Sequence, residues 1–228
     1  MQEIKYMFED KYASREFVQS HSSAMIELIG ANFLVTRDSL FGEPNKKYIE
    51  AEISWYESES LNVNDLADIY GKRVAIWDSV ADENGFINSN YGWAIYSSEN
   101  GYQFNNVVDK LVKDPDTRQA SMIYTRPSMH TDAIKNGMHD FMCTNAVNYY
   151  LRDGLLHATV QMRSNDIVYG FNNDVAWQKH VLNRLVNKLK YDKEIDVEAG
   201  NIYWNASSLH MYERHFKYLD GYHSRWLP

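Results

Sequence analysis

The chain has 228 residues, of which 44% are hydrophobic and 24% charged, as in an ordinary soluble globular protein. With eleven glycines and four prolines, the composition excludes collagen-like and low-complexity classes. The formal net charge of −8 argues against a general nucleic-acid-binding protein, whose surface is basic, so an anionic ligand would need a few well-placed arginines. The length predicts a single domain over residues 1–228.

The cysteine and histidine content limits which disulfides and metal sites the chain could form. The single cysteine, Cys143, excludes an internal disulfide framework and a cysteine-rich zinc site. His210 and His215 are five residues apart on an expected strand and would face opposite ways, so no metal site is predicted. No apolar run approaches the ~18 residues of a membrane span and no signal peptide is visible. We therefore expect a soluble, cytoplasmic protein with no membrane partner.

Two helices are predicted in the first half of the chain. Residues 47–60 have a helical pattern that includes Glu52. Residues 104–112 show a clearer apolar face, with hydrophobic side chains at intervals of three and four residues. This second helix should end at Asp114, because Pro115 disfavours helix in the residue before it.

The second half predicts strands followed by a long helix. Residues 143–151 and 155–164 are two strands joined by a hairpin at Asp153-Gly154. A polar loop over 165–174 precedes a helix whose apolar face includes Val175, Leu182 and Leu189, and residues 201–216 begin with strand-forming residues. Because the regular βαβ alternation is missing, we predict an α+β fold with a large mixed sheet flanked by helices.

Common catalytic motifs are absent: the chain has no GxGxxG, P-loop, HExxH or GxSxG sequence. Cys143 alone would most often be a buried structural thiol. Arg163 follows the partner strand, and an arginine near a thiol lowers its pKa. Arg163 with Ser164 could also clamp a phosphate, although a lone arginine at a strand end is usually solvated.

At this point several motifs resemble the thymidylate synthase family. The segments DPDTRQ, FMCTN, QMRSNDIVYGFNND and SLHMY are similar to the family's DPxSRR, Pro-Cys-His, QRSxDxxLGxPFNIA and HxY patterns. The upstream IWDSVADENG resembles IWDEWADENG. The resemblance covers about residues 27–216 in the correct order, and within the family it is strongest to phage deoxycytidylate hydroxymethylases.

The resemblance implies catalytic and folate-binding roles. Cys143 would be the nucleophile that adds to C6 of a pyrimidine nucleotide, and Glu52 a general acid/base that organises water near the base. Asp166 matches the aspartate that hydrogen-bonds the pterin of the co-substrate 5,10-methylenetetrahydrofolate. Trp77 and Tyr91 match positions lining the binding pocket, with Trp77 on the folate side.

The resemblance also implies how the nucleotide is held. Arg163 and Ser164 match phosphate ligands of the same subunit, while Arg118 matches an arginine that crosses the interface of a homodimer to the partner's phosphate site. His210 and Tyr212 match the pair that holds the 3′-hydroxyl group of the sugar. Each of these side chains, taken alone, has an ordinary structural explanation. The order in which their motifs occur along the chain favours a functional role for them over a structural one.

The chain also departs from the family pattern. The second interface arginine is Gln119, so that a phosphate contact is missing or comes from Arg126. Thr144 replaces the histidine after the nucleophile, and Val80 replaces a tryptophan. The arginine of the N-terminal phosphate loop has no counterpart. These differences argue against thymidylate synthesis but leave the nucleophile in place.

Asp174 falls where thymidylate synthases carry the asparagine of PFNIA. A carboxyl group can accept a hydrogen bond from N4 of cytosine and, when protonated, donate one to N3, whereas an asparagine amide matches uracil. Asp174 is therefore predicted to select cytosine and to take part in catalysis. The alternative is a helix N-cap role, which Asn172 or Asn173 could equally fill.

The resemblance and Asp174 together predict a deoxycytidylate hydroxymethylase. It would convert dCMP, methylenetetrahydrofolate and water into 5-hydroxymethyl-dCMP and tetrahydrofolate. The alternative within the family is a thymidylate synthase or hydroxymethylase acting on dUMP, which Asp174 disfavours. A catalytically silent nucleotide- or RNA-binding regulator on the same fold is disfavoured by Cys143, Glu52 and Arg163 together.

Overall fold

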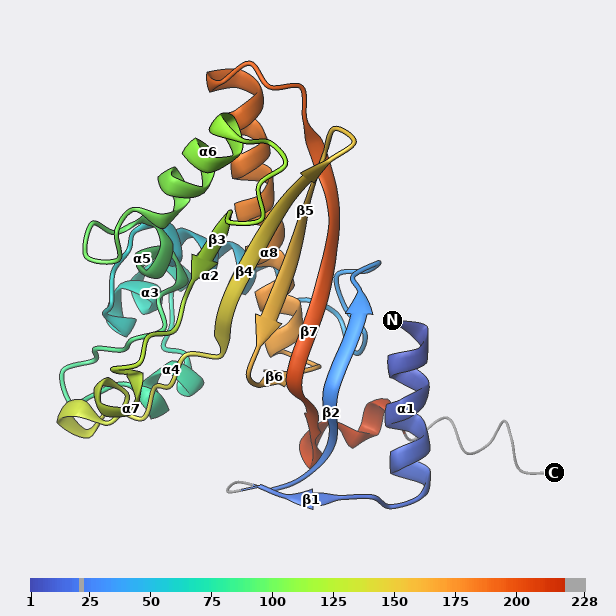
Figure 1. The fold of residues 1–228 in the computed structure, drawn as a ribbon. Helices are drawn as coiled ribbons and strands as arrows, with labels where there is room; N and C mark the ends of the chain where they lie inside the picture. Colours follow the sequence, from blue (N-terminus) through green and yellow to red (C-terminus); the bar gives the residue numbers. More distant parts are fainter. Residues whose placement is uncertain (21–22, 220–228) are drawn as a thin grey trace.

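A computed structural model describes residues 1–20 and 23–219 of the chain. A mixed sheet carries helices on one side, which confirms the predicted α+β class (Figure 1). The strands are β1 (Val18–Gln19), β2 (Ala24–Leu34), β3 (Ser121–Ile123), β4 (Thr144–Arg152), β5 (Leu155–Met162), β6 (Asn165–Asp166) and β7 (Glu198–Tyr212). The α-helices are α1 (Gln2–Ala13), α2 (Lys46–Glu57), α3 (Val63–Tyr70), α4 (Ala75–Val80), α5 (Tyr91–Tyr96), α6 (Gln103–Lys113), α7 (Met129–Asp132) and α8 (Gly170–Asn187). Short 3₁₀ turns lie at Lys135–Gly137 and Glu213–Tyr218, and a π-helical turn at Lys188–Asp192.

The sheet order is β1-β2-β7-β5-β4-β3 in the described residues, and β6 also pairs with β7. The β5–β7 and β6–β7 pairs are parallel and the others antiparallel, so the sheet is mixed as predicted. The predicted β4–β5 hairpin is confirmed, and its turn residues Asp153 and Gly154 both have positive φ, 51° and 74°. An Asp-Gly pair suits such a turn because both residues tolerate this backbone conformation better than most.

The predictions for α2 and α6 are confirmed to within a few residues, but the loop predicted over 165–174 is wrong. Strand β6 occupies its first two residues and α8 already begins at Gly170. Phe171 is fully buried one turn before Val175, so the apolar face of α8 extends further toward the N-terminus than expected. The N-cap position is Tyr169, and Asp174 lies inside the helix. The N-cap alternative for Asp174 is therefore wrong.

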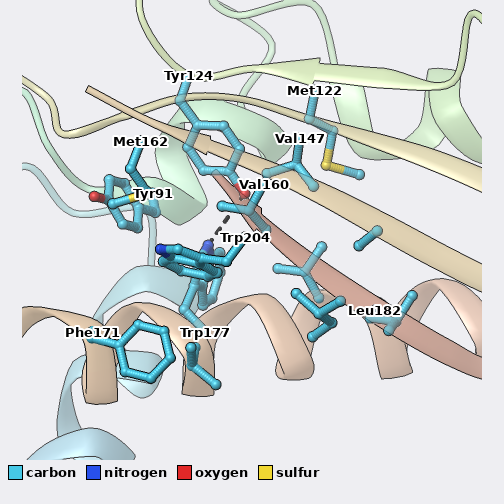
Figure 2. Close-up of a cluster of buried hydrophobic side chains, with 14 of the residues drawn as sticks. Tyr91, Met122, Tyr124, Val147, Val160, Met162, Phe171, Trp177, Leu182 and Trp204 are labelled. Atoms are coloured by element: carbon cyan, nitrogen blue, oxygen red, sulfur yellow. Dashed lines mark hydrogen bonds between the residues drawn. The ribbon is translucent and has the colours of Figure 1, made fainter. Parts of the chain in front are cut away.

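The core lies between the sheet and α8. Trp177 of α8 and Trp204 of β7 are fully buried, and Phe171 meets Trp204 edge to face at 5.3 Å between ring centroids (Figure 2). The Trp177 Nε1–H donates to the Tyr124 hydroxyl at 3.3 Å. These aromatic side chains bury large apolar areas while satisfying one polar group, which fixes α8 against the sheet.

Helices α2 and α5 approach each other unusually closely at Gly92. A Cβ atom placed on Gly92 would lie 1.7 Å from the carbonyl oxygen of Tyr56. Only glycine fits at such a backbone contact. The neighbouring Tyr91 is thereby held against α2, where its ring lies 5.2 Å from that of Tyr56.

A polar network around Glu57 connects α2 with α8. Glu57 accepts hydrogen bonds from His180 Nε2 at 2.9 Å and from the Tyr96 hydroxyl at 3.0 Å, and it pairs with Arg184. Burial alone would raise the pKa of Glu57, but these hydrogen bonds outweigh it and lower that pKa to about 2. The ionised carboxylate is thus stabilised by folding.

We expect Glu57→Gln to lower the free energy of unfolding by about 1–2 kcal/mol at pH 7, because a partly exposed charged network is weakened. Because the pKa of Glu57 is lower in the folded state, its ionised carboxylate stabilises the fold. This contribution is present above the ordinary pKa of a glutamate and is lost as pH falls through about 2. Urea unfolding at pH 7 and pH 3 measures this: the difference between wild type and variant should shrink at pH 3. A constant difference would exclude a role for the Glu57 charge.

The sheet face opposite the main helices is more exposed. Along β5, Leu156, Ala158 and Val160 are buried, whereas the alternate residues are not. Ile29 on β2 and Tyr203 on β7 are 77% and 39% exposed. Such alternation gives one face packed on the core and one open face.

Candidate active site

Cys143 lies immediately before β4, beside Arg163 at the end of β5. The Arg163 Nε–H donates to the Met142 carbonyl at 2.8 Å, and a terminal nitrogen lies 3.6 Å from Cys143 Sγ. The Arg163 backbone N–H also donates to the Cys143 carbonyl at 2.9 Å. The structure thus confirms that Arg163 and Cys143 are neighbours, and Arg163 holds the segment that presents the thiol.

The predicted effect of Arg163 on the thiol is present, since the arginine lowers the pKa of Cys143, but burial outweighs it. Burial raises the pKa of Cys143 to about 11, and the opposing effect of Arg163 is the smaller one. The nearby Asp174 and Asp140 carboxyl groups raise it further. The sequence predicted the effect of Arg163 on the thiol but not how deeply Cys143 is buried.

Glu52 faces this region from α2 and is almost fully buried. Its Oε1 accepts from the Tyr48 hydroxyl at 2.6 Å and from Trp77 Nε1 at 3.3 Å, and Trp77 Nε1 also donates to the Tyr48 oxygen at 2.9 Å. Burial raises the pKa of Glu52 to about 7, although both hydrogen bonds act to lower it. Such a carboxyl group can hold or release a proton near neutral pH.

Asp174 lies in the second turn of α8, where its Oδ2 accepts from Asn165 Nδ2 at 2.7 Å. Tyr91 also forms a hydrogen bond with Asp174. Burial and the proximity of Glu52 raise the pKa of Asp174 to about 8, against the effect of both hydrogen bonds. At neutral pH this carboxyl group is therefore mainly protonated.

Tyr91 links the catalytic candidates. Its hydroxyl forms a hydrogen bond with Thr144, and it interacts electrostatically with Asp174, Cys143 and Glu52. Burial raises the pKa of Tyr91 well above the ordinary value. The described structure thus places Cys143, Asp174 and Glu52 within electrostatic range of one tyrosine.

Asp166 and His210 form a second part of the site. They pair across the parallel β6–β7 ladder, and the Asp166 carboxylate lies 3.9 Å from Arg214 and 4.0 Å from His215. His210 is buried, which lowers its pKa and keeps the ring neutral, and it meets Tyr212 at 4.9 Å between centroids. The prediction that His210 and His215 face opposite ways on one strand is wrong, because β7 ends at Tyr212.

Ser164 is half-buried between Arg163 and Asn165, whereas Arg118 lies apart from the other candidates. Arg118 is exposed between α6 and β3. The neighbouring Ala120 accepts from the backbone of Tyr149, so this loop flanks the far half of β4 from Cys143, about 20 Å along the strand. Across residues 1–20 and 23–219, no hydrogen bond or ion pair joins Arg118 to another candidate.

Arg126, considered as a substitute phosphate ligand, is engaged within its own protomer. Its Nε–H donates to Asp132 at 2.9 Å, and a terminal nitrogen donates to Asn88 Oδ1 at 3.0 Å. The same loop is anchored by Asp140, which accepts from the backbone N–H groups of Asn88 and Ser89 at 2.6 and 2.7 Å. Asp140 thereby fixes the segment leading to Cys143.

The sequence model of the family described as Thymidylate synthase matches residues 34–226. The chain belongs to the thymidylate synthase family. It is 50% identical over 196 residues to proteins named deoxycytidylate 5-hydroxymethyltransferase from Enterobacteria phages T4 and T2, covering 86% of this chain and 78% of each relative. The same name and identity apply to the relative from Enterobacteria phage T6.

A solved structure supports the family fold. The thermostable thymidylate synthase A from Bacillus subtilis superposes with a TM-score of 0.66, over 89% of this chain and 72% of that chain, at 23% sequence identity. At this identity the likeness concerns the fold. The predicted family and its thymidylate synthase-like sheet architecture are therefore confirmed.

Three features of this family member were not predicted from its sequence: the Tyr48–Glu52 hydrogen bond, the Asn165–Asp174 hydrogen bond and the Asp140 anchor. Tyr48 precedes Glu52 by four residues on one helix, and this spacing could have indicated their contact. The Asp140 contact spans 52 residues of sequence and had no local signal.

One hollow of the family member lies apart from the candidate residues. A hollow of about 170 Å³ lies between α6 and the end of α8, lined by Tyr96, Phe104, Arg184 and Lys188 among others. None of the candidate residues lines it. In the part of the chain that the structure describes, no group of three His, Cys, Asp or Glu side chains could hold a metal ion. No helix among those residues has the length and apolar character to cross a membrane.

Proposed function

We propose that this protein is a deoxycytidylate 5-hydroxymethyltransferase. The observation that carries the proposal is the position of the Asp174 carboxyl group, which interacts electrostatically with Cys143 and is held by hydrogen bonds with Asn165 and Tyr91. Three relatives at 50% identity have this activity in their names. Since they are phage proteins, we infer that the enzyme works in the cytoplasm of an infected host and supplies modified nucleotides for phage DNA.

Asp174 would read the cytosine edge. Cytosine presents an amino donor at N4 and an acceptor at N3, and a protonated carboxyl group offers one acceptor and one donor to match them. Burial keeps this proton on Asp174 near neutral pH, since its pKa is raised to about 8. Uracil would place O4 against an acceptor and leave buried polar groups unpaired.

Cys143 would supply the nucleophile. Its sulfur forms a bond to C6 of dCMP, and the electron pair of the C5–C6 double bond makes C5 nucleophilic, while Asp174 stabilises negative charge near N3. 5,10-Methylenetetrahydrofolate supplies the one-carbon unit. C5 bonds to that carbon. Loss of the C5 proton then breaks the carbon–nitrogen bond to the folate, which releases tetrahydrofolate and leaves an exocyclic methylene. Water adds to this methylene, and Cys143 leaves as the C5–C6 double bond re-forms. Glu52, with a pKa of about 7, can accept and return a proton of that water.

The remaining candidates would bind the two substrates. Arg163 and Ser164 would hold the phosphate, and neutral His210 with Tyr212 would hold the 3′-hydroxyl group. For the folate, Asp166 fits as an acceptor: its Oδ1 accepts from the Val168 N–H at 3.0 Å and its carboxylate retains lone pairs for pterin donors. The indole of Trp77, tethered through Nε1 to Tyr48, would form a wall of the folate site. We propose no metal and no nucleic-acid partner.

We further propose a homodimer. Arg118 lies too far along β4 to reach the phosphate held by Arg163 in its own protomer, so it could serve only the site of a second copy. The open sheet face with Ile29 and Tyr203 offers a surface on which two copies could pack.

Mixing two inactive variants tests this arrangement. We expect Arg118→Ala and Cys143→Ala each to lose most activity, and their mixture to recover part of it, because hybrid dimers contain one site with both native residues. The measurement is folate-dependent tritium release from C5-labelled dCMP before and after subunit exchange. A monomer in sedimentation, with no recovery on mixing, would contradict the dimer.

Product identification tests the function itself. Incubation with dCMP and methylenetetrahydrofolate should give a product heavier than dCMP by the mass of CH₂O, as mass spectrometry would detect. A product heavier by CH₂, or turnover of dUMP in preference to dCMP, would instead identify a thymidylate synthase or a dUMP hydroxymethylase. No turnover of either nucleotide would favour a binding or regulatory protein.

A further inference from the structure

Asn165 is a buried polar residue whose side chain serves a single contact. It lies on β6 between Ser164 and Asp166, and it is 3% exposed. Its Nδ2 donates to Asp174 Oδ2 at 2.7 Å. Within the described residues, its Oδ1 is buried without a hydrogen-bond partner. The hydrogen bond of this buried amide is therefore made to Asp174, whose orientation the Asn165 side chain can fix.

The direction of this hydrogen bond restricts the carboxyl group. The Asn165 amide nitrogen donates to Asp174 Oδ2, and an unprotonated carboxyl oxygen accepts a hydrogen bond more strongly than a hydroxyl oxygen does. This contact therefore favours a proton on Oδ1 over one on Oδ2. With the Tyr91 hydrogen bond on another lone pair of the carboxyl group, the second lone pair of Oδ2 and the hydrogen on Oδ1 form an acceptor–donor pair, which matches N4–H₂ and N3 of cytosine.

We propose that Asn165 is a positioning residue that fixes the orientation of the Asp174 carboxyl group and thereby sets the preference for cytosine over uracil. This inference rests on the proposed function. Without the amide donor, the proton could occupy either oxygen, and the carboxyl group could rotate to place a donor where uracil O4 would lie. Asn165 would act through Asp174 alone, without contacting the base.

The start of α8 leaves room for this pair. A Cβ atom on Gly170 would lie 3.4 Å from Asn165 Nδ2 and 3.7 Å from Asp174 Oδ2. Both are ordinary van der Waals distances, so the backbone at position 170 packs beside the Asn165–Asp174 hydrogen bond without obstructing it.

Equilibrium binding of dCMP and dUMP to Asn165→Ala tests the proposal. We expect the Kd for dCMP to rise about tenfold and the Kd for dUMP to change less than about twofold. The reason is that the substitution removes the hydrogen bond that orients Asp174, the residue proposed to recognise the base. The matched control is Asn172→Ala, which removes an equally buried amide in the first turn of α8. Its ratio of the two Kd values should match that of wild type. An equal loss of both nucleotides in Asn165→Ala, with a lower Tm, would make Asn165 a structural residue and overturn the proposal.

A double-mutant cycle removes the remaining ambiguity. In an Asp174→Asn background, Asn165→Ala should leave the dCMP to dUMP ratio of Kd values unchanged, because the group that it positions is gone. A further change of more than about threefold would show that Asn165 acts independently of Asp174 and would overturn the proposal. Turnover of dCMP by the wild-type enzyme is measured separately, so a failure of the proposed function is recognised from that assay and not from the variants.

Discussion

Cys143→Ser should abolish turnover of dCMP while leaving its binding largely intact. A hydroxyl group is far less ionised than a thiol at neutral pH, so the bond to C6 cannot form at a useful rate. Phosphate, sugar and base contacts do not involve the sulfur and remain. Steady-state kinetics and calorimetric titration with dCMP measure the two effects. Turnover above about one hundredth of the wild-type rate would remove Cys143 from the nucleophile role.

The pH dependence gives an independent check on the same residue. Because burial raises the pKa of Cys143 to about 11, only a small fraction is thiolate at pH 7 in the free enzyme. The rate of alkylation by iodoacetamide should therefore rise steeply between pH 7 and pH 10 in wild type and be absent in Cys143→Ser. A plateau below pH 8 would mean that Arg163 outweighs burial after all.

Asp174→Asn should lower kcat/KM for dCMP by about 10²–10⁴-fold and raise it for dUMP. The loss of a charge-assisted or buried hydrogen bond and the stranding of its partner each cost roughly 1.5–3 kcal/mol, and each 1.36 kcal/mol corresponds to a tenfold change. The amide has nearly the same volume and presents the pattern that suits uracil. Both specificity constants are measured for one variant, and an unchanged ratio would contradict cytosine recognition by Asp174.

The stability of this variant distinguishes a functional from a structural carboxyl group. Burial raises the folded-state pKa of Asp174 to about 8, so folding favours the neutral acid. The stability that this protonation contributes is fully present below the ordinary pKa and is lost as pH rises through about 8. Asparagine does not titrate. We therefore expect Asp174→Asn to be more stable than wild type at pH 9 by a Tm difference of a few degrees, at about 2–4 °C per kcal/mol, and less so at pH 5.

Local patterns account for much of what the sequence predicted correctly. The apolar face of 104–112 and the Asp153-Gly154 turn each depend on residues close in sequence, and both were confirmed. The neighbourhood of Cys143 and Arg163 followed from the hairpin, because pairing β4 with β5 brings the start of one strand to the end of the other. The ordered motifs then identified the family.

Long-range packing explains what could not be predicted. The pKa of Cys143 depends on how deeply the site is covered, which no motif encodes. Asp140 meets Asn88 and Ser89 only when two loops come together. The start of α8 was misplaced because the polar residues Asn172, Asn173 and Asp174 resemble a loop, whereas tertiary contacts of Phe171 hold them in a helix.

The contact between Gly92 and the Tyr56 carbonyl limits how this site could be redesigned. A substitution can shorten a side chain to enlarge a cavity, but no substitution can shorten the two backbones that touch at Gly92 and Tyr56. The wall that carries Tyr91 therefore cannot retreat to admit a bulkier base, and any added side chain at position 92 would push α5 inward or out of place. Engineering toward larger pyrimidine substituents would have to begin at side chains such as Trp77 and Tyr48, whose mutual contact is a side-chain hydrogen bond and not a backbone contact.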